Sequence, residues 1–183
     1  MLAARGAAVV DADVAARQVL APGGPAYDGV ARRFPSVVQS PGAAVDRSAL
    51  AAIVFADPAA RRDLEALTHP AIRELMAAQT EASASSEVVV AVIPLLVEAP
   101  GRRPELDAVV VVDCPPEVAL ARVVARGMPA GQARARMAAQ ASREERLARA
   151  DHVVDNGGAL DRLTAEVDRC WEWARRRAAA ARG

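Results

Sequence analysis

The chain has 183 residues, 52% of them hydrophobic and 25% charged, which suits one globular domain and argues against a disordered or fibrous protein. With 23 basic and 23 acidic residues the net charge is zero, so no overall field would draw the molecule to nucleic acid or a membrane. Cys114 and Cys170 lack metal-ligand spacing, which argues against a metal site or a disulfide framework.

The first half of the sequence predicts a strand followed by several helices. The apolar run 7–10 has the length of a strand, and Asp11-Ala12-Asp13 ends it. Apolar side chains at helical spacing, interrupted by Pro and Gly, predict helices at 14–20, 26–34, 46–55, 58–67 and from His69 to about 80. Asp46 is the expected N-cap of the third helix, and the Pro-, Ser- and Gly-rich residues 35–44 are expected to form a loop.

The second half predicts strands that alternate with helices. The valine-rich runs 87–93 and 108–112 are typical of strands buried on both faces of a parallel sheet. Helices are expected at 116–126, 132–141 and 143–150, followed by a short strand at 152–154 and a C-terminal helix from Leu160. This order implies βαβ connections, and hence an α/β fold with a parallel sheet flanked by helices.

Polar residues that follow the predicted strands are the first candidates for ligand binding, because open α/β sheets bind ligands at the carboxyl ends of their strands. They occur at Asp11 with Asp13, at Pro94-Leu95-Leu96 with Glu98, and at Asp155 with Asn156. In the first group, one carboxylate could accept the proton of an attacking alcohol. Either aspartate could instead only cap the following helix, and the spacing leaves both roles open.

All basic residues are arginines, since the chain contains no Lys. Seven of them fall in one segment: Arg122, Arg126, Arg134, Arg136, Arg143, Arg146 and Arg149. Guanidinium groups bind phosphates and stabilise a transferring phosphoryl group, so this segment fits a phosphate-facing lid. A solvated helical face is the alternative. His69, considered alone, fits a structural histidine, because nothing near it in the sequence supplies a nucleophile.

Taken in order, these segments resemble the dephospho-CoA kinase family along nearly the whole chain. The matching motifs include Val9-Val10-Asp11-Ala12-Asp13, Val54-Phe55-Ala56-Asp57-Pro58, His69-Pro70-Ala71-Ile72, Pro94-Leu95-Leu96, Arg143-Glu144 and Val154-Asp155-Asn156. The resemblance implies a three-layer P-loop nucleotide-kinase fold in one domain over 1–183, with a helical acceptor-binding insert at about 25–85 and a lid at about 122–149.

The same resemblance implies an activity and a set of site residues. The activity is ATP-dependent phosphorylation, with Mg²⁺, of the ribose 3′-hydroxyl of dephospho-CoA. Apart from the resemblance, we expect a cytoplasmic protein, because the sequence shows neither a signal segment at its start nor an apolar stretch long enough to span a bilayer. We expect a monomer or weak homo-oligomer. Asp13 would engage the hydroxyl, with Arg136 as the second catalytic residue. The substrate-binding residues would be Asp11, Arg17, His69, Arg73, Pro94 and Leu95. The nucleotide and lid residues would be Arg122, Arg126, Gln140, Arg143 and Asn156.

The sequence departs from the family pattern at its start. Family members begin with a strand and a Gly-rich loop ending Gly-Lys-Ser/Thr, which holds phosphates and Mg²⁺. Here the match begins at Leu2, and about 20 residues are missing by the usual extent of such a unit. We therefore expect the chain as written to be nearly inactive and, without a central strand, poorly stable. Either a start codon upstream of Met1 or a true loss of the loop would explain this.

Two other functions remain open from the sequence. A remnant that binds CoA or a nucleotide without catalysis would retain the acceptor region and the lid. Another nucleoside or nucleotide kinase would share the fold, but should lack the Asp11-Ala12-Asp13 and His69-Pro70-Ala71-Ile72 combination. Nucleic-acid binding is poorly supported, because the arginines lack interleaved aromatic residues on which bases could stack.

Overall fold

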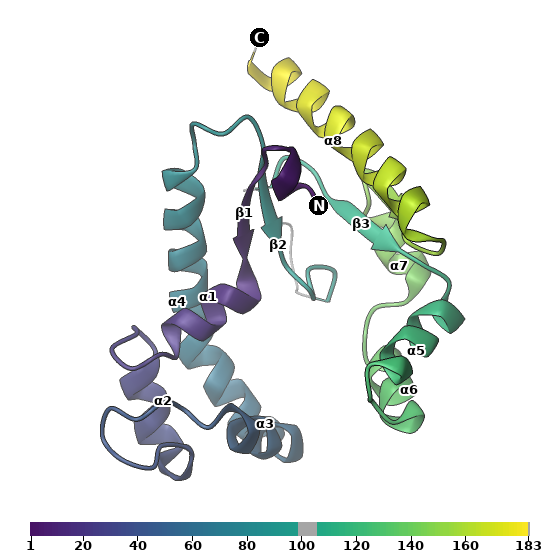
Figure 1. The fold of residues 1–183 in the computed structure, drawn as a ribbon. Helices are drawn as coiled ribbons and strands as arrows, with labels where there is room; N and C mark the ends of the chain where they lie inside the picture. The colour runs from purple at the N-terminus through teal and green to yellow at the C-terminus, as the bar shows by residue number, and fades with distance from the viewer. Residues whose placement is uncertain (99–105, 183) are drawn as a thin grey trace. The chain divides into compact units, whose positions relative to one another are not determined.

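The computed structural model describes residues 1–98 and 106–182, coloured from purple to yellow along the chain in Figure 1. The chain divides into two compact units. One is Ala8–Ile93, called the first unit below, and the other is Met1–Ala7 together with Pro94–Gly183, called the second unit. Each unit holds a two-stranded sheet.

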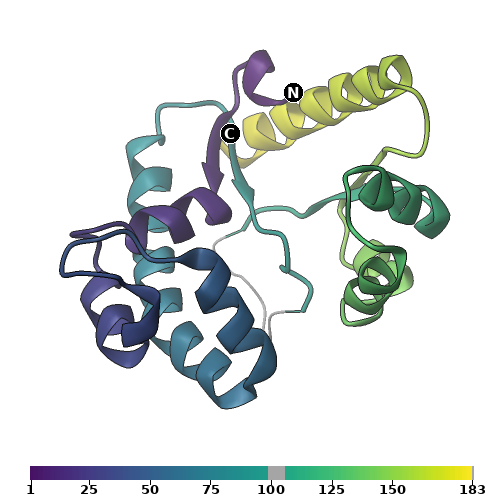
Figure 2. The same cartoon turned by 60° about the horizontal axis from the view of Figure 1, so that its bottom comes forward.

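The first unit is a parallel strand pair joined by a helical crossover. Strand β1 (Ala8–Asp11) pairs with β2 (Val89–Val92), so that Ala8 lies opposite Val89 and Asp11 opposite Val92. The crossover contains α1 (Ala12–Val19), α2 (Tyr27–Arg33), the 3₁₀ turn η2 (Pro35–Val37), α3 (Arg47–Ala56) and α4 (Pro58–Ala82). Both views show α3 alongside the N-terminal half of α4 (Figures 1 and 2).

The main hydrophobic cluster of the first unit lies among these helices and the turns between them, and Val10 on β1 is also buried. The buried members of the cluster are Tyr27, Val30, Phe34, Val37, Val45, Leu50 and Ala60. The hydroxyl of Tyr27 donates to the carbonyl of Ala43 at 2.7 Å, which satisfies its polar end while the ring stays buried. Asp46 accepts the amides of Ser48 and Ala49, both at 3.0 Å, which confirms the N-cap predicted for this helix.

The second unit is built around the parallel pair β3 (Val110–Asp113) and β4 (His152–Asp155). Its helical elements are the 3₁₀ turn η1 (Ala3–Arg5), α5 (Pro116–Ala125), α6 (Ala130–Ala138), α7 (Arg143–Ala148) and α8 (Leu160–Arg182). Helix α8 packs on β4 through Val154, Val167 and Cys170. The ring of His152 stacks on Trp173 of the same helix, with 4.8 Å between centroids.

The parallel α/β pattern is confirmed, but the described strands form two separate sheets where the sequence predicts one. A sheet of two strands buries little apolar surface, and Val112 on β3 keeps an exposed fraction of 63%.

In the described ranges, every helix is too short or too polar to span a bilayer.

The prediction that a new helix opens at His69 is wrong. Helix α4 runs without a break through Pro70, although an interior proline removes one backbone hydrogen bond. Its two halves belong to one helix because α4 packs on α1, α2, α3 and β1 along its length. Such tertiary packing outweighs the local cost, which is about 3 kcal/mol for proline in a helix interior.

Candidate active site

The two carboxylates of the acidic turn after β1 have different surroundings. Oδ1 of Asp11 accepts the amide of Asp13 at 2.8 Å and that of Val14 at 3.2 Å, and so caps α1. Asp13 lies in the first turn of α1 and is exposed. Because Asp11 already satisfies the helix N-terminus, the Asp13 carboxylate is free to meet a ligand.

The other substrate-binding residues predicted in the first unit are also exposed. Arg17 lies one turn after Asp13, and its Nε donates to the backbone carbonyl of Asp13 at 3.1 Å. His69 and Arg73 lie four positions apart on α4 and therefore share a helix face. Within the described residues, neither of these two side chains makes a hydrogen bond or an ion pair.

A pocket of about 360 Å³ lies beside the end of β1. It is lined by Val9, Val10, Asp11, Val14, Gln79, Ala82 and Ser83. Gln79 also donates from Nε2 to Oε1 of Gln18 at 3.1 Å, which links α4 to α1. Of the predicted substrate-binding residues, only Asp11 lines this pocket within the described part of the chain.

The turn that follows β2 belongs to the second unit. Pro94 and Leu95 are exposed in this turn. Farther along it, Oε1 of Glu98 accepts the amide of Ala141 at 2.9 Å. This contact joins the turn to the start of α7, inside the predicted lid.

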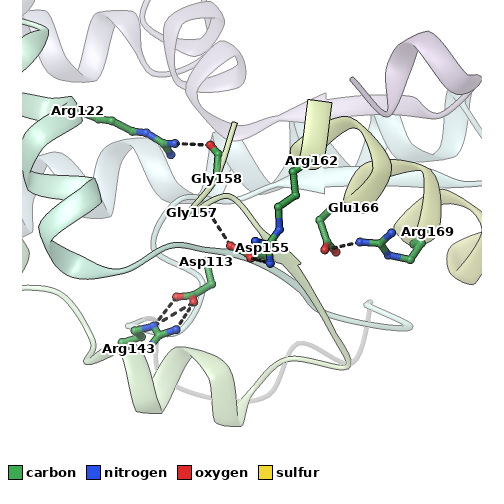
Figure 3. Close-up of polar contacts among 9 residues, drawn as sticks. All are labelled: Asp113, Arg122, Arg143, Asp155, Gly157, Gly158, Arg162, Glu166 and Arg169. Atoms are coloured by element: carbon green, nitrogen blue, oxygen red, sulfur yellow. Dashed lines mark hydrogen bonds and ion pairs between the residues drawn. The ribbon is translucent and has the colours of Figure 1, made fainter. Parts of the chain in front are cut away.

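At the end of β3, Arg143 of α7 is bound by Asp113 (Figure 3). Nε of Arg143 donates to both carboxylate oxygens of Asp113 at 3.0 Å, and Nη2 donates to Oδ2 at 2.7 Å. The Asp113 side chain is only 10% exposed, against 41% for Arg143. The hydrogen bond and the charge of Asp113 raise the pKa of Arg143 above its ordinary value.

At the end of β4, the turn 155–158 is held from both sides (Figure 3). Arg122 donates to the carbonyl of Asn156 at 2.6 Å and to that of Gly158 at 3.2 Å. Asp155 accepts the amide of Gly157 at 2.7 Å and pairs with Arg162 at 2.9 Å. A Cβ on Gly157 would come within 3.0 Å of Asp155 and of Pro115, so a side chain would crowd this turn.

The turn is also tied to the neighbouring strand, since the amide of Asn156 donates to the carbonyl of Asp113 at 2.7 Å. Asp113, Arg122, Arg143 and Asn156 therefore form one network at the carboxyl ends of β3 and β4. Arg126, Arg136 and Gln140 lie outside it with exposed side chains. Asp13 belongs to the first unit, and the arginine-rich segment 122–149 belongs to the second.

Sequence reasoning missed Asp113, the acidic centre of this network. The signal was present, because Asp113 directly follows the predicted strand 108–112, and this is the rule that selected Asp11 and Asp155. The contact between Asp113 and Arg143 spans 30 residues, so no local pattern connects them. Arg162, the partner of Asp155, was missed for want of any motif around it.

Comparison with known proteins finds a family model, described as dephospho-CoA kinase, that matches residues 1–162. A curated dephospho-CoA kinase from Frankia casuarinae is 48% identical over 171 residues, which cover 93% of this chain and 74% of that protein.

Two solved structures also resemble the chain. TT1252 from Thermus thermophilus has a TM-score of 0.76 and 34% identity, covering 92% of this chain and 85% of its own. A dephospho-CoA kinase from Campylobacter jejuni has a TM-score of 0.67 and 26% identity, covering 93% and 86%. The chain therefore belongs to the dephospho-CoA kinase family.

Proposed function

We propose that this protein transfers the γ-phosphoryl group of ATP to the ribose 3′-hydroxyl of dephospho-CoA. The hydroxyl oxygen forms a bond to the γ-phosphorus, the bond from that phosphorus to the bridging β–γ oxygen breaks, and ADP leaves. The observation that carries this proposal is the arrangement of the two aspartates after β1. Asp11 caps α1, whereas Asp13 is exposed at the carboxyl end of the strand. Asp13 is thus available to take the hydroxyl proton.

The remaining site residues receive roles that fit their positions. Arg17, one turn beyond Asp13, and His69 with Arg73 on one face of α4 would contact the acceptor, together with Asp11, Pro94 and Leu95. Arg126, Arg136, Gln140 and Arg143 would face the phosphates, with Arg136 acting in the transfer step. Asn156, in the turn held by Arg122, would border the nucleotide base.

Mg²⁺ would enter as a complex with ATP. Within the described residues, no group of three or more His, Cys, Asp and Glu side chains could hold a metal ion. In phosphoryl transfer, Mg²⁺ is held largely by phosphates and water rather than by an all-protein cage. The metal would neutralise charge on the phosphates when bound.

A coupled assay of ADP release tests the proposed reaction. The acceptors are dephospho-CoA, adenosine and AMP, and mass spectrometry identifies the product. Because the family resemblance leads us to expect little turnover without a Gly-rich loop, the chain is assayed alone and also fused behind a strand and a loop that ends Gly-Lys-Ser/Thr. We expect 3′-phosphorylated product from dephospho-CoA alone, faster in the fused form.

Two outcomes would count against the proposal. Preference for adenosine or AMP would assign the chain to nucleoside or nucleotide kinases. Binding of dephospho-CoA without ADP release in either form would instead favour a binding protein without catalytic activity.

A further inference from the structure

One edge of the Arg143 guanidinium is bound to Asp113 while another edge stays open. A guanidinium offers five N–H donors in a fixed plane. The pair with Asp113 uses Nε–H and one N–H of Nη2. Within residues 1–98 and 106–182, both N–H groups of Nη1 remain without a partner, and the side chain is 41% exposed. Arg143 can therefore bind a second anion without releasing Asp113.

The backbone around Arg143 is also held in place. Ser142 caps α7 by accepting the amide of Glu145 at 3.1 Å, and Glu145 accepts the amide of Ser142 in return at 2.7 Å. One residue earlier, Ala141 donates to Glu98 at 2.9 Å. Both the side chain and the helix that carries it are thus fixed before any ligand arrives, which lowers the entropy lost on binding.

We propose that Asp113 is a positioning residue that fixes Arg143 so that its Nη1 edge binds a phosphate of ATP at the carboxyl end of β3. The inference rests on the proposed function for the choice of ATP as ligand. Asp113 itself touches no ligand and acts through Arg143. A lone arginine on a flexible lid would have to lose several rotamers on binding the phosphate, whereas this one has already lost them.

Calorimetric titration of the full chain with MgATP and with adenosine tests this role. Asp113→Asn keeps the size of the side chain but removes its charge, and we expect it to weaken ATP binding by about 3- to 10-fold. Arg143→Ala removes the phosphate contact itself and should weaken ATP binding by about 10-fold or more. Adenosine has no phosphate, so its affinity should stay unchanged in both variants.

The double variant distinguishes positioning from general destabilisation. If Asp113 acts only through Arg143, adding Asp113→Asn to Arg143→Ala should cause no further loss of ATP affinity. Asp168→Asn is the matched control, because it makes the same carboxylate-to-amide change in the Arg5–Asp168 ion pair of the same unit. We expect this control to leave ATP affinity unchanged.

Several results would overturn the inference. Unchanged ATP affinity in Asp113→Asn would show that Asp113 has no role in ATP binding. Tighter binding would show that Asp113 competes with the phosphate for Arg143. An equal loss of adenosine affinity would show that Asp113 acts through the Asn156 turn. Additive losses in the double variant, a matching loss in the control, or no ATP binding by the unchanged chain would also contradict it.

Failure of the proposed function gives a different result. If the unchanged chain binds ATP with the predicted pattern of variants, but neither the chain alone nor its fused form phosphorylates dephospho-CoA, the proposed reaction falls while the role of Asp113 stands. If turnover is present, Asp113→Asn should raise the KM for ATP and leave the KM for dephospho-CoA unchanged.

Discussion

Asp11 ends β1 in the first unit and Asp113 ends β3 in the second, so each unit places a carboxylate at the carboxyl end of a parallel strand. Asp11 accepts two amides of the helix that starts directly after it. Asp113 instead accepts hydrogen bonds from the guanidinium of Arg143, at the start of α7. The difference follows from the next residues, because α5 begins only after Cys114 and the N-cap Pro115, beyond the reach of Asp113.

The two units also differ in what stabilises them. The first unit has an apolar core among its helices, and its predicted site residues Asp13, His69 and Arg73 are exposed. The second unit has a smaller buried cluster, and hydrogen bonds and ion pairs hold its strand ends. We infer that apolar packing leaves the charged side chains of the first unit available to ligands, whereas the charged side chains at the strand ends of the second unit also organise its structure.

We expect the largest change in stability from a substitution in the core of the first unit. Phe34 is 3% exposed, and Phe34→Ala should lower the free energy of unfolding by about 3–5 kcal/mol. Phe55 is 89% exposed and gives the matched control, with a change within about 0.5 kcal/mol for Phe55→Ala. Urea unfolding followed by far-UV circular dichroism measures both.

Tryptophan fluorescence sharpens this test, because Trp171 and Trp173 both lie on α8 in the second unit. If the units are stabilised separately, Phe34→Ala should leave the urea midpoint of the fluorescence transition unchanged. An equal shift of that midpoint would show that the two units unfold together, and the contrast between them would fail.

The next effect concerns the exposed carboxylate of the first unit. If Asp13 accepts the hydroxyl proton, Asp13→Asn should reduce turnover by about 10²-fold or more. The assay uses whichever form of the chain is more active with dephospho-CoA. Asp46→Asn makes the same change at the N-cap of α3, where Asn caps as well as Asp. Turnover close to normal in Asp13→Asn would remove Asp13 from the chemistry.

A smaller effect is expected at the cap. Asp11→Ala removes the acceptor for the amides of Asp13 and Val14, so the free energy of unfolding should fall by about 0.5–2 kcal/mol. Asp11→Asn retains a capping oxygen and should restore most of the stability. Urea denaturation compares the two variants, and equal losses would show that the carboxylate charge matters more than the cap.

The smallest effect is on the acid stability of the second unit. The hydrogen bond from Arg5, with its charge, lowers the pKa of Asp168. A lowered folded-state pKa stabilises the fold above the unfolded-state value, and this contribution is lost as the pH falls through the folded-state value, below about pH 4. Asp168→Asn should therefore flatten the fall in stability of this unit in acid, as followed by tryptophan fluorescence. An unchanged dependence of stability on pH would show that the Arg5–Asp168 pair contributes little to the stability of the second unit.

Much of the local structure could be predicted from the sequence. Each strand was placed by its valine-rich run, and α3 was placed together with its cap Asp46, because these signals depend on neighbouring residues. The site was predictable only in part. Asp11 and Asp13 were found together, but which of them caps α1 depended on the backbone dihedral angles at the end of β1.

The order of the strands and helices, the acidic turn after β1, the arginine-rich segment 122–149 and the family resemblance can all be recognised without the structure. Each of these features depends only on residues close together in the chain and on their spacing. Three features required the folded chain: α4 continues through Pro70, Arg122 holds the turn 155–158, and Asp113 binds Arg143. These features depend on contacts between residues far apart in the chain, whose energies no local pattern records.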